Sequence, residues 1–121
     1  SRYLKPGGWI VVSEASWFTD RRPTEIQDFW NENYAEIDTI PKKVAQMQEA
    51  GYVPVAHFIM PEYAWWNYFD PIRANYAPFL ARHNDSPAAR LMVRHFEEEI
   101  ALYEKYCNYY GYVFYIGHKP E

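Results

Sequence analysis

Hydrophobic positions follow two different periods along the chain, and this change of period separates predicted strands from predicted helices. The first signal is an unbroken apolar run, Trp9–Val12, directly after the turn formers Pro6–Gly8. Proline presets φ for a turn, and glycine adopts backbone angles that side chains forbid. Such a run is typical of a strand buried on both faces, as in a parallel sheet. We expect this strand to end at the polar pair Ser13-Glu14 and a loop to cover residues 16–22.

Two segments with helical spacing follow. The first spans Thr24–Glu36, and the second spans Lys42–Ala50 with Thr39 as a candidate cap. Gly51 suits the left-handed position that commonly ends a helix. Each segment places apolar side chains on one face; these are Ile26, Phe29, Trp30 and Ala35 in the first and Val44, Ala45 and Met47 in the second.

Two further strands are predicted, one in the middle of the chain and one at its end. Tyr52–Met60 contains Pro54, which donates no hydrogen bond to a ladder, so this strand is expected at a sheet edge or with a bulge. Tyr112–His118 is short, aromatic and β-branched, as strands commonly are. The sequence therefore predicts three strands with helices between them.

The segment 61–110 between these two strands has helical character. Asp70 and Pro71 predict the start of a helix that runs to about Arg82, with Pro78 kinking or breaking it. A turn at 83–87 leads into a longer helix over 88–109. Its expected apolar positions are Leu91, Met92, His95, Phe96, Leu102, Tyr103, Tyr106 and Cys107.

Composition narrows the classes of function. The chain has 121 residues, enough for one small core, and a formal net charge of -4, which argues against a nucleic-acid surface. It has one cysteine, so no intrachain disulfide forms and a reducing, cytoplasmic location is expected. Its apolar runs are shorter than the roughly 20 residues that a membrane helix needs. His83 and His95 lack further ligands at metal-site spacing, so no metal is expected.

The ordered motifs resemble those of one enzyme family. Leu4-Lys5-Pro6-Gly7-Gly8 with its apolar strand resembles the turn before the fifth strand of class I S-adenosylmethionine-dependent methyltransferases. Residues 46–52, Gln-Met-Gln-Glu-Ala-Gly-Tyr, are similar to the family's junction between a helix and the sixth strand. Residues 112–119 look like its aromatic-rich seventh strand, which is antiparallel and inserted between the fifth and sixth. Together these motifs cover nearly the whole chain.

The resemblance implies an α/β fold, the C-terminal half of a Rossmann-like methyltransferase sheet. It has three strands, the last antiparallel and inserted centrally, and a helical insertion at about 61–110. The whole of 1–121 is then the C-terminal part of one methyltransferase domain. The insertion resembles a subgroup of small-molecule methyltransferases, many of them from gut bacteria, with helices over the substrate side.

The family binds its cofactor through an earlier half, and the chain lacks that motif. Its five glycines form no G-x-G-x-G pattern. We therefore expect S-adenosylmethionine to be the cofactor of a longer parent, with no cofactor-binding residue here. The chain is expected to be a truncated or proteolytic piece, inactive by itself and with no cofactor bound.

Candidate site residues fall in two places. Glu14 is the first carboxylate after the predicted buried strand, so it is a candidate general base or substrate contact; the alternative is a cap or salt bridge. Ser16 and Trp17 are candidates for the same site, with packing as the alternative for Trp17. A dense aromatic cluster is a candidate lid or cage for a cationic amine, or packs the insertion onto the sheet; its members are Tyr63, Trp65, Trp66 and Tyr68.

Two function classes follow. The first is part of a methyltransferase that acts on a small-molecule methyl acceptor, and the alternative is a non-catalytic α/β module that binds a protein partner. Half of a Rossmann dehydrogenase is a weaker rival, which an antiparallel last strand disfavours. No nucleic acid or membrane partner is expected. The first strand would expose a bare apolar edge, which predicts a homodimer or a domain-swapped assembly.

Overall fold

The computed structural model describes residues 7–120, so the predicted turn at Leu4–Pro6 lies outside the described residues. These residues form two compact units. The sheet unit comprises residues 7–60 and 108–120, and the helical unit comprises residues 61–107.

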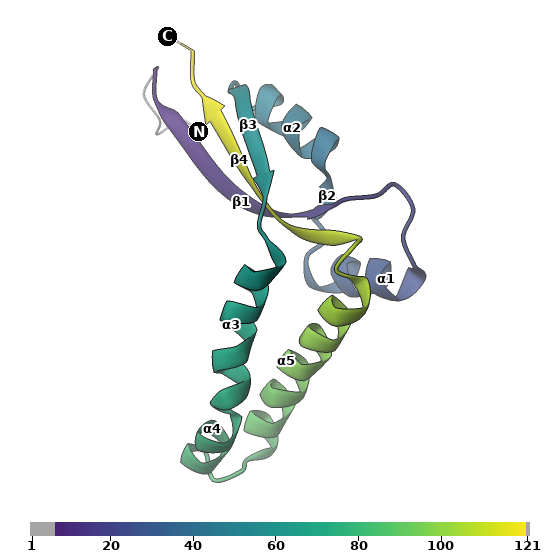
Figure 1. Cartoon of the computed structure of the whole chain (residues 1–121), viewed down its shortest axis with the longest axis vertical. Coiled ribbons are helices and arrows are strands. Elements are labelled where there is room, and N and C mark those ends of the chain that lie inside the picture. Colours follow the sequence, from purple (N-terminus) through teal and green to yellow (C-terminus); the bar gives the residue numbers. More distant parts are fainter. Residues whose placement is uncertain (1–6, 121) are drawn as a thin grey trace. The chain divides into compact units, whose positions relative to one another are not determined.

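The sheet unit contains four strands in the order β2-β1-β4-β3 (Figure 1). They span Trp9–Trp17 (β1), Asp38–Thr39 (β2), Val53–Ile59 (β3) and Tyr110–His118 (β4). β4 lies between β1 and β3 and is antiparallel to both. The predicted fold class, an α/β sheet with a central antiparallel last strand, is confirmed.

The predicted number of three strands is wrong, because the described residues form four. The additional strand, β2, is two residues long and pairs in parallel with Ser16 and Trp17 at the end of β1. It directly precedes the second helix, where the sequence suggested only a cap at Thr39. A two-residue strand carries no periodic signal, so only its pairing partner reveals it.

β1 differs from its prediction in length and in burial. It continues beyond Ser13-Glu14 to Trp17 and pairs with β4 throughout. Its first half is not buried on both faces, since Trp9 is 59% and Val11 61% exposed. The last three residues of β1 are the buried ones. The apolar run therefore predicted the strand correctly, but the buried residues lie at the C-terminal end of the strand and not within the run.

β3 is an edge strand, as Pro54 predicted. Its register with β4 shifts between Pro54 and Ala56. Farther along, Phe58 stacks on Phe114 of β4, with ring centroids 4.9 Å apart. The proline thus marks an irregularity at the start of an otherwise paired strand.

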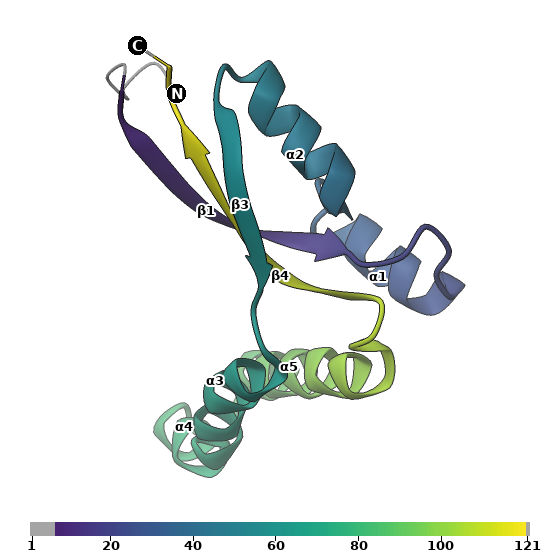
Figure 2. The same ribbon diagram turned by 45° about the horizontal axis from the view of Figure 1, so that its top comes forward.

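Two helices belong to the sheet unit, α1 (Thr24–Asn33) and α2 (Ile40–Glu49). α1 buries Ile26 and Trp30 and ends before the predicted Glu36, which leaves Ala35 exposed beyond it. α2 lies along one face of the sheet, called here the α2 face (Figure 2). Gly51 follows it with a φ of 94°, the left-handed conformation that was predicted.

The close approach of α2 to β4 depends on a glycine. A Cβ added at Gly117 would lie 2.8 Å from Sδ of Met47 and 3.2 Å from Cβ of Tyr52. A larger residue would therefore require the Met47 side chain to move and Tyr52 to shift slightly. Gly117 sets how closely the second layer packs on the sheet.

The helical unit consists of α3 (Glu62–Ala74), α4 (Tyr76–Arg82) and α5 (Pro87–Tyr106). The predicted start at Pro71 is wrong, because α3 begins nine residues earlier at Glu62 and contains Pro71 in its last turns. The predicted break at Pro78 is also misplaced. The helices separate at Asn75, and Pro78 occupies the first turn of α4, where a missing N–H costs nothing.

The core of the helical unit is aromatic. Trp65 and Phe69, one turn apart on α3, are buried, and Trp65 stacks on Tyr103 of α5 with centroids 4.4 Å apart. At the other end of α5, Leu91 and Met92 are exposed rather than buried as predicted. Ser86 caps this helix, since its Oγ accepts a hydrogen bond from the N–H of Ala89.

Candidate functional site

The second half of β1 carries three of the predicted site residues. Side chains alternate between the faces of a strand, so Glu14 and Ser16 share the α2 face while Trp17 lies on the opposite one. Parallel pairing with β2 and antiparallel pairing with β4 hold this end of the strand on both sides. The backbone that presents these side chains is therefore fixed by two ladders.

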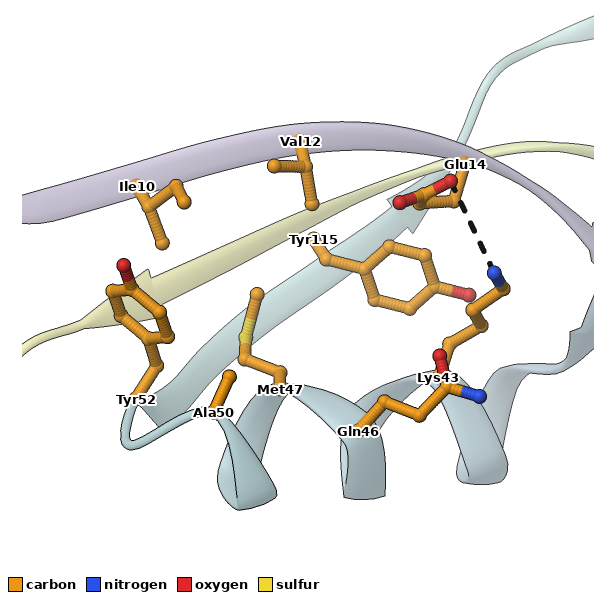
Figure 3. Close-up of a pocket in the computed structure, with 9 residues that line it drawn as sticks. All are labelled: Ile10, Val12, Glu14, Lys43, Gln46, Met47, Ala50, Tyr52 and Tyr115. Carbon is orange, nitrogen blue, oxygen red and sulfur yellow. Dashed lines mark ion pairs between the residues drawn. The ribbon is translucent and has the colours of Figure 1, made fainter. Parts of the chain in front are cut away.

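The Glu14 carboxylate has two partners. Its Oε2 accepts a hydrogen bond of 2.7 Å from the hydroxyl of Tyr34. The same oxygen lies 3.9 Å from Nζ of Lys43 (Figure 3). Lys43 is only 7% exposed, and Glu14 is about one-third exposed. The hydrogen bond to Glu14 and burial both raise the pKa of Tyr34. The salt bridge that the sequence analysis gave as the alternative role of Glu14 is present. A catalytic role of Glu14 stays a prediction.

Ser16 is completely buried and links two strands. Its hydroxyl donates to the carbonyl oxygen of Glu14 at 3.1 Å and lies 2.7 Å from the hydroxyl of Tyr115 on β4. Since a serine hydroxyl has one proton, Tyr115 is the donor in the second bond. Burial raises the pKa of Tyr115. Ser16 therefore acts as an internal connector.

Trp17 is buried within an aromatic group of the sheet unit. The Arg22 guanidinium lies 4.2 Å from the centroid of its ring, and Tyr110 meets it edge-on at 6.3 Å. Tyr110 also packs on Trp30, with centroids 5.1 Å apart. These contacts match the packing alternative, and substrate contact by Trp17 stays a prediction.

A cavity of about 190 Å³ lies between the sheet and α2. One end is polar, where Glu14, Lys43 and the Tyr115 hydroxyl converge (Figure 3). The other end is mostly apolar, with the hydroxyl of Tyr52 as its polar group. Its lining consists of Ile10, Val12, Glu14, Lys43, Gln46, Met47, Ala50, Tyr52 and Tyr115. The arrangement suits a small group with one polar end, and Glu14 is the one lining carboxylate available to accept a proton there.

The four predicted aromatic site residues lie on α3 in different environments. Trp65 is buried against Tyr103, whereas Tyr63 and Tyr68 are 68% and 56% exposed. Trp66 is half-buried, and its indole N–H contacts Glu62 Oε1 at 3.5 Å. The helical unit does not gather these rings around one point. Their role in substrate binding stays a prediction.

Among residues 7–120, no three His, Cys, Asp or Glu side chains lie together in a way that suits a metal ion. No helix in the same part of the chain is long and apolar enough to cross a membrane.

Sequence reasoning missed Tyr34, Lys43 and Tyr115 as parts of the site. The signal for Lys43 was its spacing, since it lies between Ile40 and Met47 on the inward stripe of α2. A lysine on an apolar stripe indicates a buried carboxylate opposite it. Tyr34 had no such signal, because it lies just after the end of α1.

Comparisons with known proteins gave matches to solved structures. No protein-family model and no curated protein sequence matches the chain. A methyltransferase from Geobacter sulfurreducens, solved with S-adenosylhomocysteine, matches 99% of the chain and 49% of its own length, at 20% identity and a TM-score of 0.75. YjhP from Escherichia coli matches 98% of the chain and 52% of its own, at 19% identity and a TM-score of 0.72.

A third solved structure is phosphoethanolamine N-methyltransferase 2 from Haemonchus contortus in complex with S-adenosylmethionine. It matches 99% of the chain and 28% of its own, at 12% identity and a TM-score of 0.77. The chain spans about half the length of the first two of these proteins. At these identities the likeness shows the fold: the chain has the fold of part of an S-adenosylmethionine-dependent methyltransferase.

Proposed function

We propose that the chain is part of an S-adenosylmethionine-dependent methyltransferase that transfers a methyl group to a small molecule. The supporting observation is the central antiparallel β4 between β1 and β3. The same arrangement superposes over nearly the whole chain on solved methyltransferases. Because the chain spans about half of such proteins, the activity belongs to a longer parent.

Gly51, Gly111 and Gly117 do not fit a cofactor cradle. A cradle needs backbone that a ligand can approach, but the Cα of Gly111 faces Phe18 and that of Gly117 faces Met47. Gly51 serves to end α2. We therefore assign no cofactor contact to these residues and expect the isolated chain to be inactive.

In this proposal Glu14 contacts the methyl acceptor or accepts its proton. Methyl transfer depends mainly on positioning, so the value of such a carboxylate lies in its fixed orientation. Tyr34 donates a hydrogen bond to Glu14 Oε2, and Nζ of Lys43 lies 3.9 Å from the same oxygen. These two contacts orient the carboxylate, and a general base has to be oriented toward the proton that it accepts.

The test compares the isolated chain with its parent by calorimetric titration with S-adenosylhomocysteine. We expect binding to the parent and none to the isolated chain. The parent should also carry a strand-G-x-G-x-G-helix unit before residue 1. A parent without that unit, or one that binds no S-adenosylhomocysteine, would refute the proposed function.

The role of Glu14 needs a separate comparison in the parent enzyme. Glu14→Gln keeps an oxygen to accept the Tyr34 hydrogen bond but removes the base, so kcat should fall at least about tenfold while cofactor affinity stays constant. The matched control is Glu32→Gln, an exposed carboxylate on α1. Equal activity of the Glu14 variant and the control would restrict Glu14 to a structural role.

A non-catalytic interaction module is the second candidate. The observation in its favour is the number of large apolar side chains on the surface of the sheet unit, among them Trp9, Val11, Val53, Val55, Phe58 and Ile59. Exposed apolar groups at this density mark interaction sites in many proteins. The titration above separates the two candidates, because a binding module has no affinity for S-adenosylhomocysteine.

A further inference from the structure

The ammonium group of Lys43 is buried without a hydrogen bond. The Lys43 side chain is 7% exposed, and its Nζ lies 3.9 Å from Oε2 of Glu14. A hydrogen bond between an ammonium and a carboxylate spans about 2.7–2.9 Å, so this contact is an ion pair only. Within residues 7–120 the ammonium forms no other polar contact. Lysine carries three N–H donors, and buried donors are normally paired, so Lys43 lacks an oxygen acceptor.

One oxygen of the Glu14 carboxylate also lacks a partner. Tyr34 donates its hydrogen bond to Oε2, which is the oxygen that faces Lys43. Oε1 forms no hydrogen bond or ion pair with the described part of the chain. In Figure 3 this second oxygen points away from the ion pair and into the cavity. The polar end of the cavity therefore holds an unused acceptor next to unused donors.

The charges of the lining favour an uncharged ligand. Of the described lining residues, Glu14 and Lys43 alone are charged, and their charges are opposite. A buried ammonium ligand would face Lys43, and a buried carboxylate ligand would face Glu14, so either would add a charge without its own counter-charge. A hydroxyl group donates one hydrogen bond and accepts others while it stays neutral. It can therefore donate to Glu14 and accept from Lys43 at the same time.

The rest of the cavity has the size of a single ring. Its volume is about 190 Å³, and its walls beyond the polar end include Ile10, Val12 and Met47. An apolar protein cavity of about 150 Å³ holds one benzene molecule. The lining comes from β1, α2, β4 and residues 50 and 52 between α2 and β3. Every wall of the cavity thus lies within this chain, and a longer parent contains all of them.

We propose that this cavity binds the methyl acceptor, an assignment that rests on the proposed function, and that the acceptor is an uncharged, ring-sized molecule with a hydroxyl group, such as a simple phenol. The hydroxyl donates to Glu14 Oε1 and accepts from Lys43 Nζ. The ring lies against Val12 and Met47. Lys43 thereby gains the acceptor that the chain does not supply, and the hydroxyl proton faces the carboxylate that is the candidate base.

The test titrates the parent and the 121-residue chain with phenol, which is neutral at pH 7, and follows binding by NMR. Toluene is the matched probe, because a methyl group replaces the hydroxyl. We expect toluene to bind at least about tenfold more weakly, since it leaves both polar groups unpaired. Benzoate and benzylammonium carry a negative and a positive charge, and each should also bind at least about tenfold more weakly than phenol.

Two substitutions in the 121-residue chain locate the binding. Val12→Phe fills the cavity and should abolish phenol binding, whereas Val11→Phe, on the opposite face of β1 and 61% exposed, should leave it unchanged. Lys43→Met keeps the stem but removes the donor, so phenol should bind about fivefold more weakly while toluene does not. Lys42→Met is the matched control, since the Lys42 side chain is 72% exposed. Circular dichroism verifies that the variants remain folded.

A preference for phenol that Lys43→Met reduces, with binding that Val12→Phe abolishes, supports the proposal. Equal affinity for phenol and toluene, or full binding in Val12→Phe, would overturn it. Binding to the chain but not to the parent would also overturn it, because the cavity would then be filled in the longer protein. If Val12→Phe does not fold, the comparison of phenol with toluene in the unchanged chain and in Lys43→Met still decides.

Titration of the parent with S-adenosylhomocysteine separates this proposal from the proposed function. A parent that binds S-adenosylhomocysteine but not phenol refutes the assigned ligand class and leaves the methyltransferase proposal standing. A parent that binds phenol in this cavity but not S-adenosylhomocysteine supports the ligand class and refutes the methyltransferase proposal.

Discussion

The hydroxyl groups of Ser16 and Tyr115 lie 2.7 Å apart and connect two neighbouring strands whose residues are 99 positions apart in sequence. Ser16 in turn donates a hydrogen bond to the carbonyl oxygen of Glu14. The two hydrogen bonds therefore link Tyr115 through Ser16 to the backbone of Glu14, the candidate base. Both side chains are buried. The loss of stability on removing either hydroxyl therefore depends on whether the remaining hydroxyl keeps a hydrogen-bond partner.

Removing the two hydroxyls should have unequal effects on stability. Ser16→Ala leaves the buried Tyr115 hydroxyl without its acceptor and should cost about 1–3 kcal/mol of unfolding free energy. Tyr115→Phe leaves Ser16 bonded to Glu14 and should cost only about 0.5–1.5 kcal/mol. Urea denaturation of both variants measures the difference. A larger loss for Tyr115→Phe would contradict this direction of hydrogen bonding.

The Glu14–Lys43 pair should also respond unequally to the loss of each partner. Glu14→Gln leaves the buried Lys43 ammonium without its counter-charge. Glu14 is about one-third exposed, so we expect the free energy of unfolding to fall by about 2 kcal/mol. This loss is smaller than the usual loss when one partner of a fully buried pair is removed. Lys43→Met keeps the apolar stem, and Glu14 retains the Tyr34 hydrogen bond, so the loss should be about 1 kcal/mol. A double-mutant cycle measures the coupling, and a value near zero would show that the pair contributes nothing.

The sheet was predictable where local chemistry determines structure. Pro54 cannot donate to a ladder, and this one residue placed β3 at the edge. The burial of β1 was not predictable, because Trp9 and Val11 are as apolar as any core residue yet lie exposed. Burial along a strand depends on what covers it, and that information lies outside the strand. The pairing of β2 with Ser16 was hidden for the same reason.

In the helical unit, the local helix-start signal at Asp70-Pro71 led to a wrong prediction of where the first helix begins. Asp70-Pro71 resembles a helix start, whereas Trp65 and Phe69, four residues apart and both buried, already belong to α3. The four-residue spacing of these two aromatic residues would have predicted the start of α3 more accurately. In the candidate site, Glu14 was identified by its place after an apolar run, but its partners were not. Tyr34 and Lys43 come from separate elements, which only the tertiary fold brings together.

Stability at alkaline pH should depend on Tyr103. Burial raises the pKa of Tyr103 from its ordinary value of 10.0 to about 12. The unfolded chain therefore ionises first, and stability that is complete below about pH 10 is lost as the pH rises toward 12. Denaturation of wild type and Tyr103→Phe between pH 8 and 12 checks this. The variant should lose less stability over this interval, and an identical loss in both proteins would contradict the prediction.

The packing of α2 against β4 should not tolerate a side chain at Gly117. Gly117→Ala brings a methyl group to 2.8 Å from Met47 Sδ, and such overpacking typically costs about 1–3 kcal/mol. Met47→Ala in the same chain removes the obstruction and should recover part of that loss. Thermal denaturation of the single and double variants provides the comparison. Additive losses would place the strain at Tyr52 rather than at Met47.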